Sequence, residues 1–374
     1  MSIRVYGLEL RRFTLPLAAP LAIGEHALTD RSGLLFCLSA GARRETAAWF
    51  FGEISPLPGV HPEDIAAAER DARHIIESFA ECEVPTEAAE LFNFLSVCFS
   101  PETCMSVRSG VEAAFIQAAA HAARLTPAEF LREDAAAAVQ INALVPAGAE
   151  MSAALEELRG YSSIKLKVGR DSIADDAARV RALSARLRPG VYLRLDANRS
   201  WSLPEALRFA AEVSNCPIEY IEEPLADPAL LPEFFRSTGL PVAYDESLRG
   251  RKASDLRLFD GLAAFVLKPQ TLGGWSGLEP WVAKARSRGV RIIISSVYES
   301  GLGLHMLAQF AAAVNAGELT GAAAAGLDTC RALAADLIEP AFKPGGFPLG
   351  IATHEIYALR LRKELATPIL TREL

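Results

Sequence analysis

The sequence predicts an α/β protein whose larger part is a barrel of parallel strands, preceded by a smaller α+β domain. From Val139 onward, short apolar strands recur at intervals of a few tens of residues, with helical patterns between them. Such alternation is typical of a parallel sheet, which can close into a barrel. The predicted strands are Val139–Val145, Ser163–Val168, Tyr192–Ala197, Ile218–Glu222, Val242–Asp245, Ala264–Lys268 and Val290–Ser295. We expect a barrel domain at residues 131–344.

Residues 1–130 lack this rhythm and predict a small α+β domain. Its expected strands are Arg4–Leu15, Ser32–Ala40 and Thr46–Glu53. The stretch from Pro16 to Asp30 holds two prolines and a glycine, which predicts a loop because these residues interrupt regular strands. A rigid turn is expected at residues 52–59. After it, His61-Pro62-Glu63-Asp64 is expected to open a helix, with acids in its first turn that suit the helix dipole.

Helices are expected between the barrel strands, for example at Asp171–Arg188 and Pro204–Val213. The second of these follows a Ser202 cap, with Glu205 placed to complete a capping box. A last short strand or turn is expected near Ala323–Asp328. The tail, residues 345–374, alternates again at Ile356–Leu361 and is expected to pack back on the N-terminal domain.

The composition argues against several kinds of partner. The chain of 374 residues has 38 basic and 46 acidic side chains and a net charge of −8, without a basic run that nucleic acid or an acidic membrane would bind. Six cysteines without CxxC spacing predict neither a zinc site nor a disulfide framework. No apolar run is long enough to span a membrane. We expect a reduced, cytoplasmic protein acting on a small-molecule carboxylate, while the oligomeric state is open.

Three successive predicted strands end in a carboxylate. These residues are Asp196, Glu222 and Asp245. Because the C-terminal ends of barrel strands meet at one face, the three side chains should converge. Carboxylates in a low-dielectric site repel one another unless they are protonated or hold a cation. A hard divalent ion with oxygen ligands, Mg²⁺ foremost, fits such a set. The alternative is that each acid caps a helix or lies in a solvated loop.

Lysines flank the same predicted face. In Ser163–Val168 the apolar residues point to one side, and Lys165 and Lys167 point to the other. Lys268 ends a strand four strands further on, across the barrel. A lysine becomes a useful base when burial and neighbouring cations lower its pKa, and Lys165 is such a neighbour for Lys167. The alternative is that all three are exposed lysines at strand ends.

Together these motifs resemble the enolase superfamily, in its muconate-lactonizing-enzyme-like subgroup. Lys165-Leu166-Lys167 is similar to the KxK motif of that subgroup, and Lys268-Pro269 to its second-lysine segment. Its metal-ligand segments are matched by Asp196-Ala197-Asn198, Ile221-Glu222-Glu223-Pro224 and Asp245-Glu246-Ser247. The N-terminal part resembles the capping domain of the family, most clearly at residues 52–59. The resemblance covers nearly the whole chain and implies a modified TIM barrel, (β/α)7β, with an N-terminal α+β capping domain.

Within the subgroup, four segments resemble more specifically a dehydratase of menaquinone biosynthesis. These segments are residues 193–201, 245–249, 295–303 and 326–329. The resemblance implies a carbon–oxygen lyase that removes water from 2-succinyl-6-hydroxy-2,4-cyclohexadiene-1-carboxylate by syn dehydration through an enediolate. The implied cofactor is Mg²⁺, with Mn²⁺ as a substitute.

The same resemblance implies a role for each site residue. The implied metal ligands are Asp196, Glu222 and Asp245, whose Mg²⁺ would bind the substrate carboxylate and stabilise the enediolate. Lys167 would take the α-proton and return it to the departing hydroxyl, and Lys268 would be a fixed cation on the opposite face. Lys165 would tune Lys167, while Asn198 and Glu246 would support the ligands.

Other residues receive narrower expectations. Ser295 and Ser296, at the end of the seventh strand, are candidates for binding the succinyl carboxylate, or they simply form a polar strand end. The loop from about Leu17 to Asp30 resembles the mobile substrate-covering loop of the family, with an ordinary connector as the alternative. Arg31 is expected to be a hinge or an ion-pair partner without a catalytic role. Packing roles are expected for Trp201 and Trp275.

The main rival is a racemase or epimerase acting on N-acylamino acids or dipeptides. Such an enzyme would use Lys167 and Lys268 as acid and base on opposite faces, so the lysine pair does not discriminate. Dipeptide epimerases of this subgroup often carry an Asp-x-Asp element beyond the seventh strand, whereas residues 295–300 here read Ser-Ser-Val-Tyr-Glu-Ser. The dehydratase is therefore favoured. A binding or scaffold protein on a decayed barrel would lack a ligand or a lysine, and none is missing.

Overall fold

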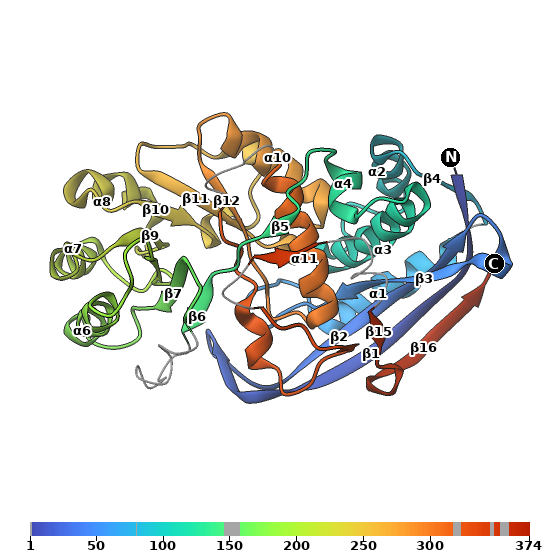
Figure 1. Cartoon of the computed structure of the whole chain (residues 1–374), viewed down its shortest axis with the longest axis horizontal. Helices are drawn as coiled ribbons and strands as arrows, with labels where there is room; N and C mark the ends of the chain where they lie inside the picture. Colours follow the sequence, from blue (N-terminus) through green and yellow to red (C-terminus); the bar gives the residue numbers. More distant parts are fainter. Residues whose placement is uncertain (1, 80, 146–157, 317–322, 345–347, 352–358) are drawn as a thin grey trace.

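The computed structural model describes residues 2–79, 81–145, 158–316, 323–344, 348–351 and 359–374. A long antiparallel sheet covered by helices forms one end of the molecule, and a curled parallel sheet with outer helices forms the other (Figure 1). The predicted fold class, an α/β barrel with an N-terminal cap, is confirmed. Within the described ranges, no helix is both long enough and apolar enough to cross a membrane.

The N-terminal end of the molecule, here called the cap, is built on three long antiparallel strands. They are β1 (Ser2–Ile23), β2 (His26–Gly41) and β3 (Ala48–Ile54). Two further strands pair with β1, namely β4 (Glu83–Pro85) and β16 (Ala366–Glu373). The end of the chain therefore lies against its beginning, as the adjacent blue and red strands in Figure 1 show.

The stretch from Pro16 to Asp30 is a β-hairpin, so the prediction of a loop there is wrong. The pairing of β1 with β2 is interrupted between Pro16 and Leu21, where Pro16 and Pro20 have no backbone N–H to donate. It resumes with Leu21 opposite Leu28, and Gly24 forms the turn at a φ of +54°. The prolines thus interrupt the ladder without ending the strands.

Among the described residues, three helices pack on the cap sheet, namely α1 (Ile65–Ser78), α2 (Ala88–Ser96) and α3 (Met105–Ala123). A fourth, α4 (Pro127–Leu131), packs on α3 and on α11 (Gly301–Val314). Helix α1 begins at Ile65, later than predicted, so the expected acids precede the helix and do not lie in its first turn. Asp64 caps it instead, because its carboxylate accepts a hydrogen bond from the backbone N–H of Ala67. Helix α3 packs closely on β3 because Gly52 and Gly110 meet: a β-carbon on Gly52 would lie 1.7 Å from the carbonyl oxygen of Gly110.

The parallel sheet has seven strands in the order β12-β11-β10-β9-β8-β7-β6. They are β6 (Ala143–Val145), β7 (Ser163–Lys167), β8 (Tyr192–Asp196), β9 (Ile218–Glu222), β10 (Val242–Tyr244), β11 (Leu262–Leu267) and β12 (Arg291–Ile294). All but β6 lie within two residues of the predicted bounds. The prediction of one strand at Val139–Val145 is wrong, because β5 (Ala138–Val139) is separate and pairs with β14 (Leu349–Gly350).

Helices connect these strands and cover the outer face of the sheet. They are α6 (Ile173–Ser184), α7 (Leu203–Glu212), α8 (Leu231–Thr238), α9 (Pro269–Leu272), α10 (Trp275–Arg286) and α11 (Gly301–Val314). Helix α7 begins as predicted: the Glu205 carboxylate accepts hydrogen bonds from the backbone N–H of Ser202 at 2.9 Å and from its hydroxyl at 2.6 Å. Helices α6, α7 and α8 lie outside the sheet, whereas α11 lies toward the cap (Figure 1).

The strand or turn expected at Ala323–Asp328 is reduced to two bridging residues. Ala325 pairs with Ile141, just before β6, and Gly326 pairs with Ser295, just after β12. These two residues connect the two edges of the seven-stranded sheet. A longer side chain would not fit at this point, because a β-carbon on Gly326 would lie 2.7 Å from the hydroxyl oxygen of Ser295.

The remaining elements are short. Strand β13 (Ile338–Glu339) pairs with β15 (Arg360–Leu361), whereas residues 356–358 of the predicted alternation at 356–361 lie outside the described residues. The 3-10 turns are η1 (Arg44–Thr46), η2 (Pro228–Leu230), η3 (Glu246–Leu248), η4 (Ala253–Asp255), η5 (Asp328–Ala332) and η6 (Lys363–Leu365).

Both tryptophans expected in packing roles are buried. Trp201 lies with its ring centroid 4.4 Å from that of Phe209 on α7. Trp275 lies 5.7 Å from Phe310 on α11, and the Arg132 guanidinium is 5.5 Å from its ring. The two indoles thus help to pack the outer helices on the barrel.

Candidate active site

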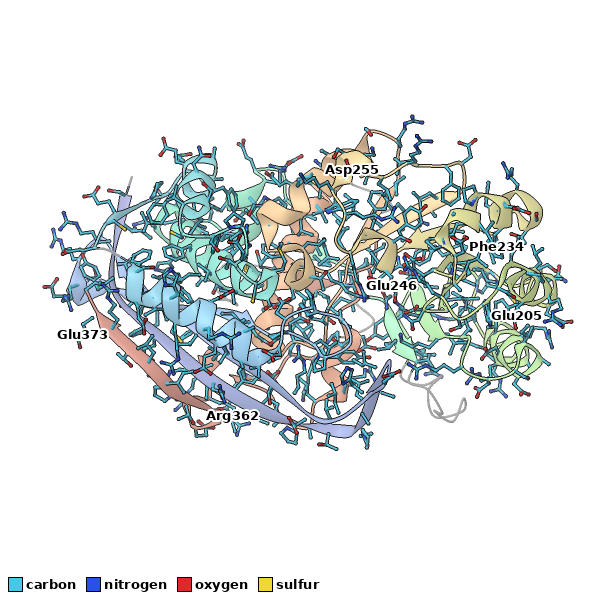
Figure 2. The ribbon with its side chains drawn as sticks, turned by 180° about the vertical axis from the view of Figure 1, so that it is seen from behind. Glu205, Phe234, Glu246, Asp255, Arg362 and Glu373 are labelled. Carbon is cyan, nitrogen blue, oxygen red and sulfur yellow. The ribbon has the colours of Figure 1, made fainter. Side chains whose placement is uncertain are left out.

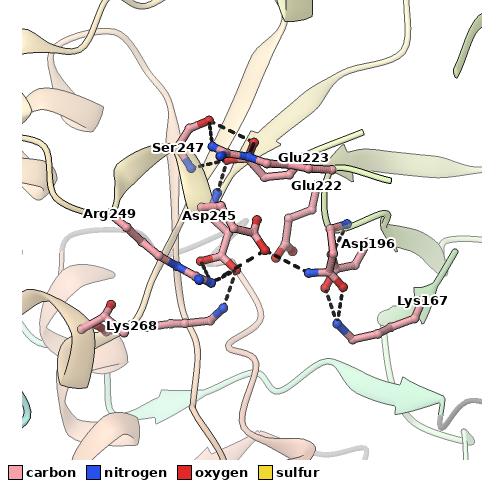
Figure 3. A network of polar contacts seen from close by, with 12 residues as sticks. Lys167, Asp196, Glu222, Glu223, Asp245, Ser247, Arg249 and Lys268 are labelled. Carbon is pink, nitrogen blue, oxygen red and sulfur yellow. Dashed lines mark hydrogen bonds and ion pairs between the residues drawn. The ribbon is translucent and has the colours of Figure 1, made fainter. Parts of the chain in front are cut away.

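Three carboxylates lie at the ends of neighbouring strands, as Figure 3 shows. Asp196 at the end of β8 is paired in register with Glu222 at the end of β9. Ala243 on β10 is also paired with Glu222, and Asp245 directly follows that strand. All three acids are buried. The structure thus brings together the three acids that the sequence singled out.

Lysines approach these acids from two sides. Lys167 Nζ lies 3.3 Å from Asp196 Oδ2 and 2.6 Å from Asn198 Oδ1. Lys268 forms an ion pair with Asp245. In Figure 3 the two lysines lie on opposite sides of the acids. This arrangement places one ammonium group on each side of a carboxylate cluster.

The third lysine of the site lies between the acids. Lys165 Nζ is 2.9 Å from Asp196 Oδ2 and 2.7 Å from Glu222 Oε2. Burial acts to lower the pKa of Lys165, but Asp196 and Glu222 outweigh it and hold the pKa well above the usual value. Lys165 is therefore a fixed positive charge in this structure.

The acids themselves are in unequal environments. Burial and the neighbouring charges of Asp196 and Asp245 raise the pKa of Glu222 to about 8. Burial also acts to raise the pKa of Asp196, but Lys165 and Lys167 outweigh it and lower the pKa. The lysines thus neutralise only part of the cluster, and Glu222 bears the remaining repulsion.

The donor set fits a divalent cation. Glu222 Oε1 is buried and has no hydrogen-bond partner. As the side chains stand, no group of three or more acidic, histidine or cysteine residues in the described part of the chain encloses a position for a metal ion. The lysines hold the acids through ion pairs instead. The candidate donors are all carboxylate oxygens, which are the ligands that Mg²⁺ prefers, and one of them is free to bind. The three acids would hold the ion once their ion pairs with the lysines loosen.

Asn198 and Glu246 contact each other beside the acids. Asn198 Nδ2 donates to Glu246 Oε1 at 3.1 Å, and the Asn198 backbone N–H donates to Asp196 Oδ1 at 3.2 Å. Arg249 adds a positive charge, with Nη2 lying 3.4 Å from Asp245 and 3.7 Å from Glu246. Figure 2 shows Glu246 between the cap and the barrel, whereas Glu205 lies at the outer surface. Both predicted supporting residues therefore lie at the site.

Sequence reasoning assigned no role to Glu223, which holds the loop after β10. Its carboxylate accepts from the backbone N–H groups of Asp245 at 3.0 Å and Ser247 at 2.6 Å, and from the Ser247 hydroxyl at 2.9 Å. Arg199 donates to it at 3.1 Å. Glu223 has a φ of +40°, and its carboxylate contacts the loop after β10, whereas the carboxylate of Glu222 contacts Lys165. The sequence shows these residues only as Glu-Glu-Pro, which does not reveal that the two acids have different partners.

Arg194 also received no role, and it is fully buried inside the barrel. Its guanidinium donates to Glu219 at 2.7 Å, to the Asn142 side chain at 3.1 Å and to the Ala324 carbonyl at 2.6 Å. It therefore connects β8 with β9 and with the segment that closes the barrel. The alternation of polar and apolar residues in β8 places Arg194 on the same face as Asp196, which is the signal that could have found it.

Ser295 and Ser296 line a pocket with the three lysines. The pocket is lined by Asn142, Leu144, Lys165, Lys167, Asp196, Asn198, Lys268, Ser295, Ser296, Tyr298, Gly326, Asp328 and Thr329. The Ser296 hydroxyl lies 2.5 Å from that of Thr329. Tyr298 and Thr329 were not predicted as site residues, because they reach the pocket through loops whose path the sequence does not define.

Comparison with known proteins identifies the family. The family model "Enolase C-terminal domain-like" matches residues 148–344, and the model "MenC, N-terminal domain" matches residues 5–108. An o-succinylbenzoate synthase from Yersinia pseudotuberculosis serotype O:3 (strain YPIII) is 33% identical over 88% of this chain and 92% of its own. The chain belongs to the o-succinylbenzoate synthase family. The o-succinylbenzoate synthase of Salmonella dublin is 30% identical over 89% of this chain and 93% of its own.

Solved structures give the same fold for this o-succinylbenzoate synthase family member. The L-Ala-D/L-Glu epimerase from Bacillus subtilis superposes with a TM-score of 0.78 at 23% identity, covering 92% of this chain and 95% of its own. Muconate lactonizing enzyme from Pseudomonas fluorescens has a TM-score of 0.78 at 20% identity, covering 96% and 97%. The dipeptide epimerase from Cytophaga hutchinsonii, solved with Mg and a dipeptide, has a TM-score of 0.75 at 19% identity, covering 96% and 98%.

The superfamily predicted from the lysine and acid motifs is confirmed, and so is the prediction of an enzyme. Membership of the o-succinylbenzoate synthase family also agrees with the finer resemblance to a dehydratase. The structural neighbours include epimerases, but at these identities they establish the fold alone.

Proposed function

We propose that the protein is a Mg²⁺-dependent o-succinylbenzoate synthase. It would dehydrate 2-succinyl-6-hydroxy-2,4-cyclohexadiene-1-carboxylate to o-succinylbenzoate in menaquinone biosynthesis. The observation that carries the proposal is the pair Lys167 and Lys268 on opposite sides of three buried carboxylates, in a chain whose relatives are o-succinylbenzoate synthases. Removal of a proton beside a carboxylate needs a base near a strong positive charge, which this arrangement offers.

The metal ligands in this proposal are Asp196, Glu222 and Asp245. When bound there, Mg²⁺, or Mn²⁺ in its place, would act as a Lewis acid whose charge lowers the free-energy barrier to removal of the substrate proton. Asn198 and Glu246 would hold the ligands in place through the hydrogen bonds they make beside Asp196.

Lys167 is proposed as the base. It would take the proton from the ring carbon next to the carboxylate, and the C–H electron pair would pass into that carboxylate to give an enediolate. The same lysine would then return the proton to the ring hydroxyl as the C–O bond breaks, so that water leaves and the ring becomes aromatic. One base acting twice from one side requires the hydrogen and the hydroxyl to lie on the same face.

The other predicted residues would position the substrate and its charge. Lys268, paired with Asp245, would stay protonated on the opposite face and stabilise the developing negative charge. Lys165, paired with two acids, would add a fixed charge beside Lys167. Ser295 and Ser296 line the pocket and would donate to the succinyl carboxylate.

An ultraviolet assay tests this function. Purified protein with Mg²⁺ is mixed with the cyclohexadiene hydroxy acid, and diene absorbance is followed. We expect rapid loss of absorbance, abolished by EDTA and reduced about 10³-fold in Lys167→Ala. The absence of turnover by folded, Mg²⁺-loaded wild type would refute the assignment.

A racemase or epimerase of the same superfamily is the second candidate. It is favoured by the presence of a lysine on each side of the acids, the arrangement that two-base proton transfer needs. Incubation with N-acylamino acids and dipeptides in D₂O would reveal it as exchange of the α-proton, and no exchange would exclude it for the compounds tested.

We also propose a cytoplasmic location, with a small-molecule carboxylate as the partner and neither nucleic acid nor a membrane. The acidic net charge, without a basic run, supports this. Cell fractionation would test the location, since recovery in the membrane pellet would contradict it.

A further inference from the structure

The loop after β12 contains a residue in an unusual backbone conformation. Tyr298 has a φ of +64°, a left-handed region that a bulky side chain rarely adopts. It lines the same pocket as Lys167, Lys268 and Ser295. Left-handed backbone at a non-glycine residue persists only where its surroundings hold it, and it concentrates at functional sites. Neighbouring groups must therefore hold the backbone of Tyr298 in this conformation.

The side chain of Arg31, from the cap, donates hydrogen bonds to backbone carbonyls of this loop. Its Nε donates to the Tyr298 carbonyl at 3.3 Å, and its Nη2 donates to the Val297 carbonyl at 3.3 Å. The same guanidinium donates to the carbonyls of Ser55 and Pro56, which directly follow β3 in the cap and are here called the cap turn. Only 2% of Arg31 is exposed. One buried side chain thus joins the cap turn to the pocket loop, and a fork of five N–H donors suits this task.

A second cap residue fixes the far end of the same loop. Glu53 accepts from the Ser300 hydroxyl at 2.5 Å, from the Ser300 backbone N–H at 3.1 Å and from the Gly303 backbone N–H at 3.2 Å. These N–H groups open helix α11, where an anion is stabilised. The backbone from Val297 to Ser300 is thus held at both ends by the cap, and Tyr298 lies between the two attachments.

We propose that Arg31 is a positioning residue that fixes Tyr298 as one wall of the substrate pocket, so that the cap sets substrate affinity through this loop. The proposal deepens the proposed function and rests on it for the choice of substrate. In the described part of the chain, the hydrogen bonds of Arg31 go to backbone carbonyls and not to the lysines or acids of the site, so its effect should fall on binding and not on the chemical step.

The test compares Arg31→Lys with wild type. Lysine keeps the charge but has no fork to span the carbonyls of both segments. We expect the KM for the cyclohexadiene hydroxy acid to rise about tenfold, with kcat changed less than about threefold. Hydrogen exchange in the peptide 295–303 should accelerate about tenfold. Arg372→Lys is the matched control, since Arg372 also donates to cap carbonyls, at Ile76 and Glu77, but far from the pocket.

Two further variants test the role of Tyr298. Tyr298→Ala removes the ring and should raise KM about tenfold without a large change in kcat. In Tyr298→Gly, glycine adopts the left-handed backbone without help from Arg31. The double variant Arg31→Lys/Tyr298→Gly should therefore exchange in peptide 295–303 less than about threefold faster than Tyr298→Gly alone.

The outcomes are distinct. Wild-type KM in Arg31→Lys or in Tyr298→Ala, or an equal effect of Arg372→Lys, would overturn the proposal. So would unchanged exchange of peptide 295–303 in Arg31→Lys. If the wild type does not turn over the cyclohexadiene acid, the proposed function fails, whereas the exchange measurements still decide whether Arg31 holds the loop.

Discussion

Lys165 Nζ lies 2.7 Å from Glu222 Oε2, although the two residues belong to strands β7 and β9, which do not pair. Strand β8 lies between them, and its Asp196 accepts from the same ammonium at 2.9 Å. A single cation therefore offsets part of the repulsion between two buried acids. The other oxygen of Glu222 has no partner, which leaves room for a second positive charge at this point.

Replacing Glu222 by Gln should weaken Mg²⁺ binding at least about 100-fold while keeping the fold. The amide keeps the shape of the side chain but removes one of the negative charges that attract a hard cation. Calorimetric titration of metal-free protein measures this directly. Glu205→Gln is the control, because Glu205 only caps α7 and its loss should leave Mg²⁺ affinity unchanged. Wild-type affinity in Glu222→Gln would remove Glu222 from the ligand set.

Arginine substitutions should separate the roles of the two flanking lysines. Arginine keeps the charge but cannot release a proton at ordinary pH. Lys167→Arg should therefore lose about 10³-fold in kcat, whereas Lys268→Arg should stay within about 30-fold of wild type. The measurement is steady-state turnover of the cyclohexadiene acid. Equal loss in both variants would mean that Lys268 also exchanges a proton, which favours two-base chemistry.

The acids could be found from the sequence because the information is local. Asp196, Glu222 and Asp245 each follow a short apolar strand, and the geometry of a parallel sheet brings strand ends together without further knowledge. The same reasoning located Lys167 and Lys268. The pairing partners were not local, and the bridging of Asp196 and Glu222 by Lys165 follows only from the register of three strands.

Contacts between the cap and the barrel could not be predicted. Glu53 accepts from Ser300, and Arg31 donates to Tyr298, across more than two hundred residues of sequence. No periodicity encodes such a contact. The hairpin from residue 16 to residue 30 shows another limit: the prolines indicate where pairing is interrupted, but the pairing on both sides of the break keeps the strands together.

Replacing Gly52 by Ala should destabilise the cap by at least about 3 kcal/mol. The new β-carbon would lie 1.7 Å from the Gly110 carbonyl oxygen, so β3 and α3 would have to separate. Thermal unfolding measures the change. Gly7→Ala in β1 is the control, because its β-carbon would meet its nearest atom at 3.5 Å, an ordinary contact. Equal melting temperatures for the two variants would show that α3 moves away without cost.

The pH dependence of stability should report on Glu112. This buried acid on α3 accepts from the backbone N–H of Ser276 at 3.1 Å and from its hydroxyl, at the start of barrel helix α10. Burial outweighs these hydrogen bonds and raises the pKa of Glu112 to about 8, against 4.5 for an ordinary glutamate. Between these values the folded protein keeps a proton that the unfolded chain releases. The stabilisation from this proton is complete below pH 4.5 and is lost as the pH rises through about 8.

Glu112→Gln cannot titrate and should therefore lose less stability than wild type when the pH is raised. The difference between the two should change by on the order of 3 kcal/mol between pH 5.5 and pH 9. Thermal unfolding of both proteins across this range measures it, with Glu90→Gln on the exposed face of α2 as the control that should run parallel to wild type. Parallel profiles for Glu112→Gln and wild type would mean that Glu112 is ionised in the folded protein at neutral pH. The contact between α3 and the start of α10 would then be a charged helix cap and not a protonated one.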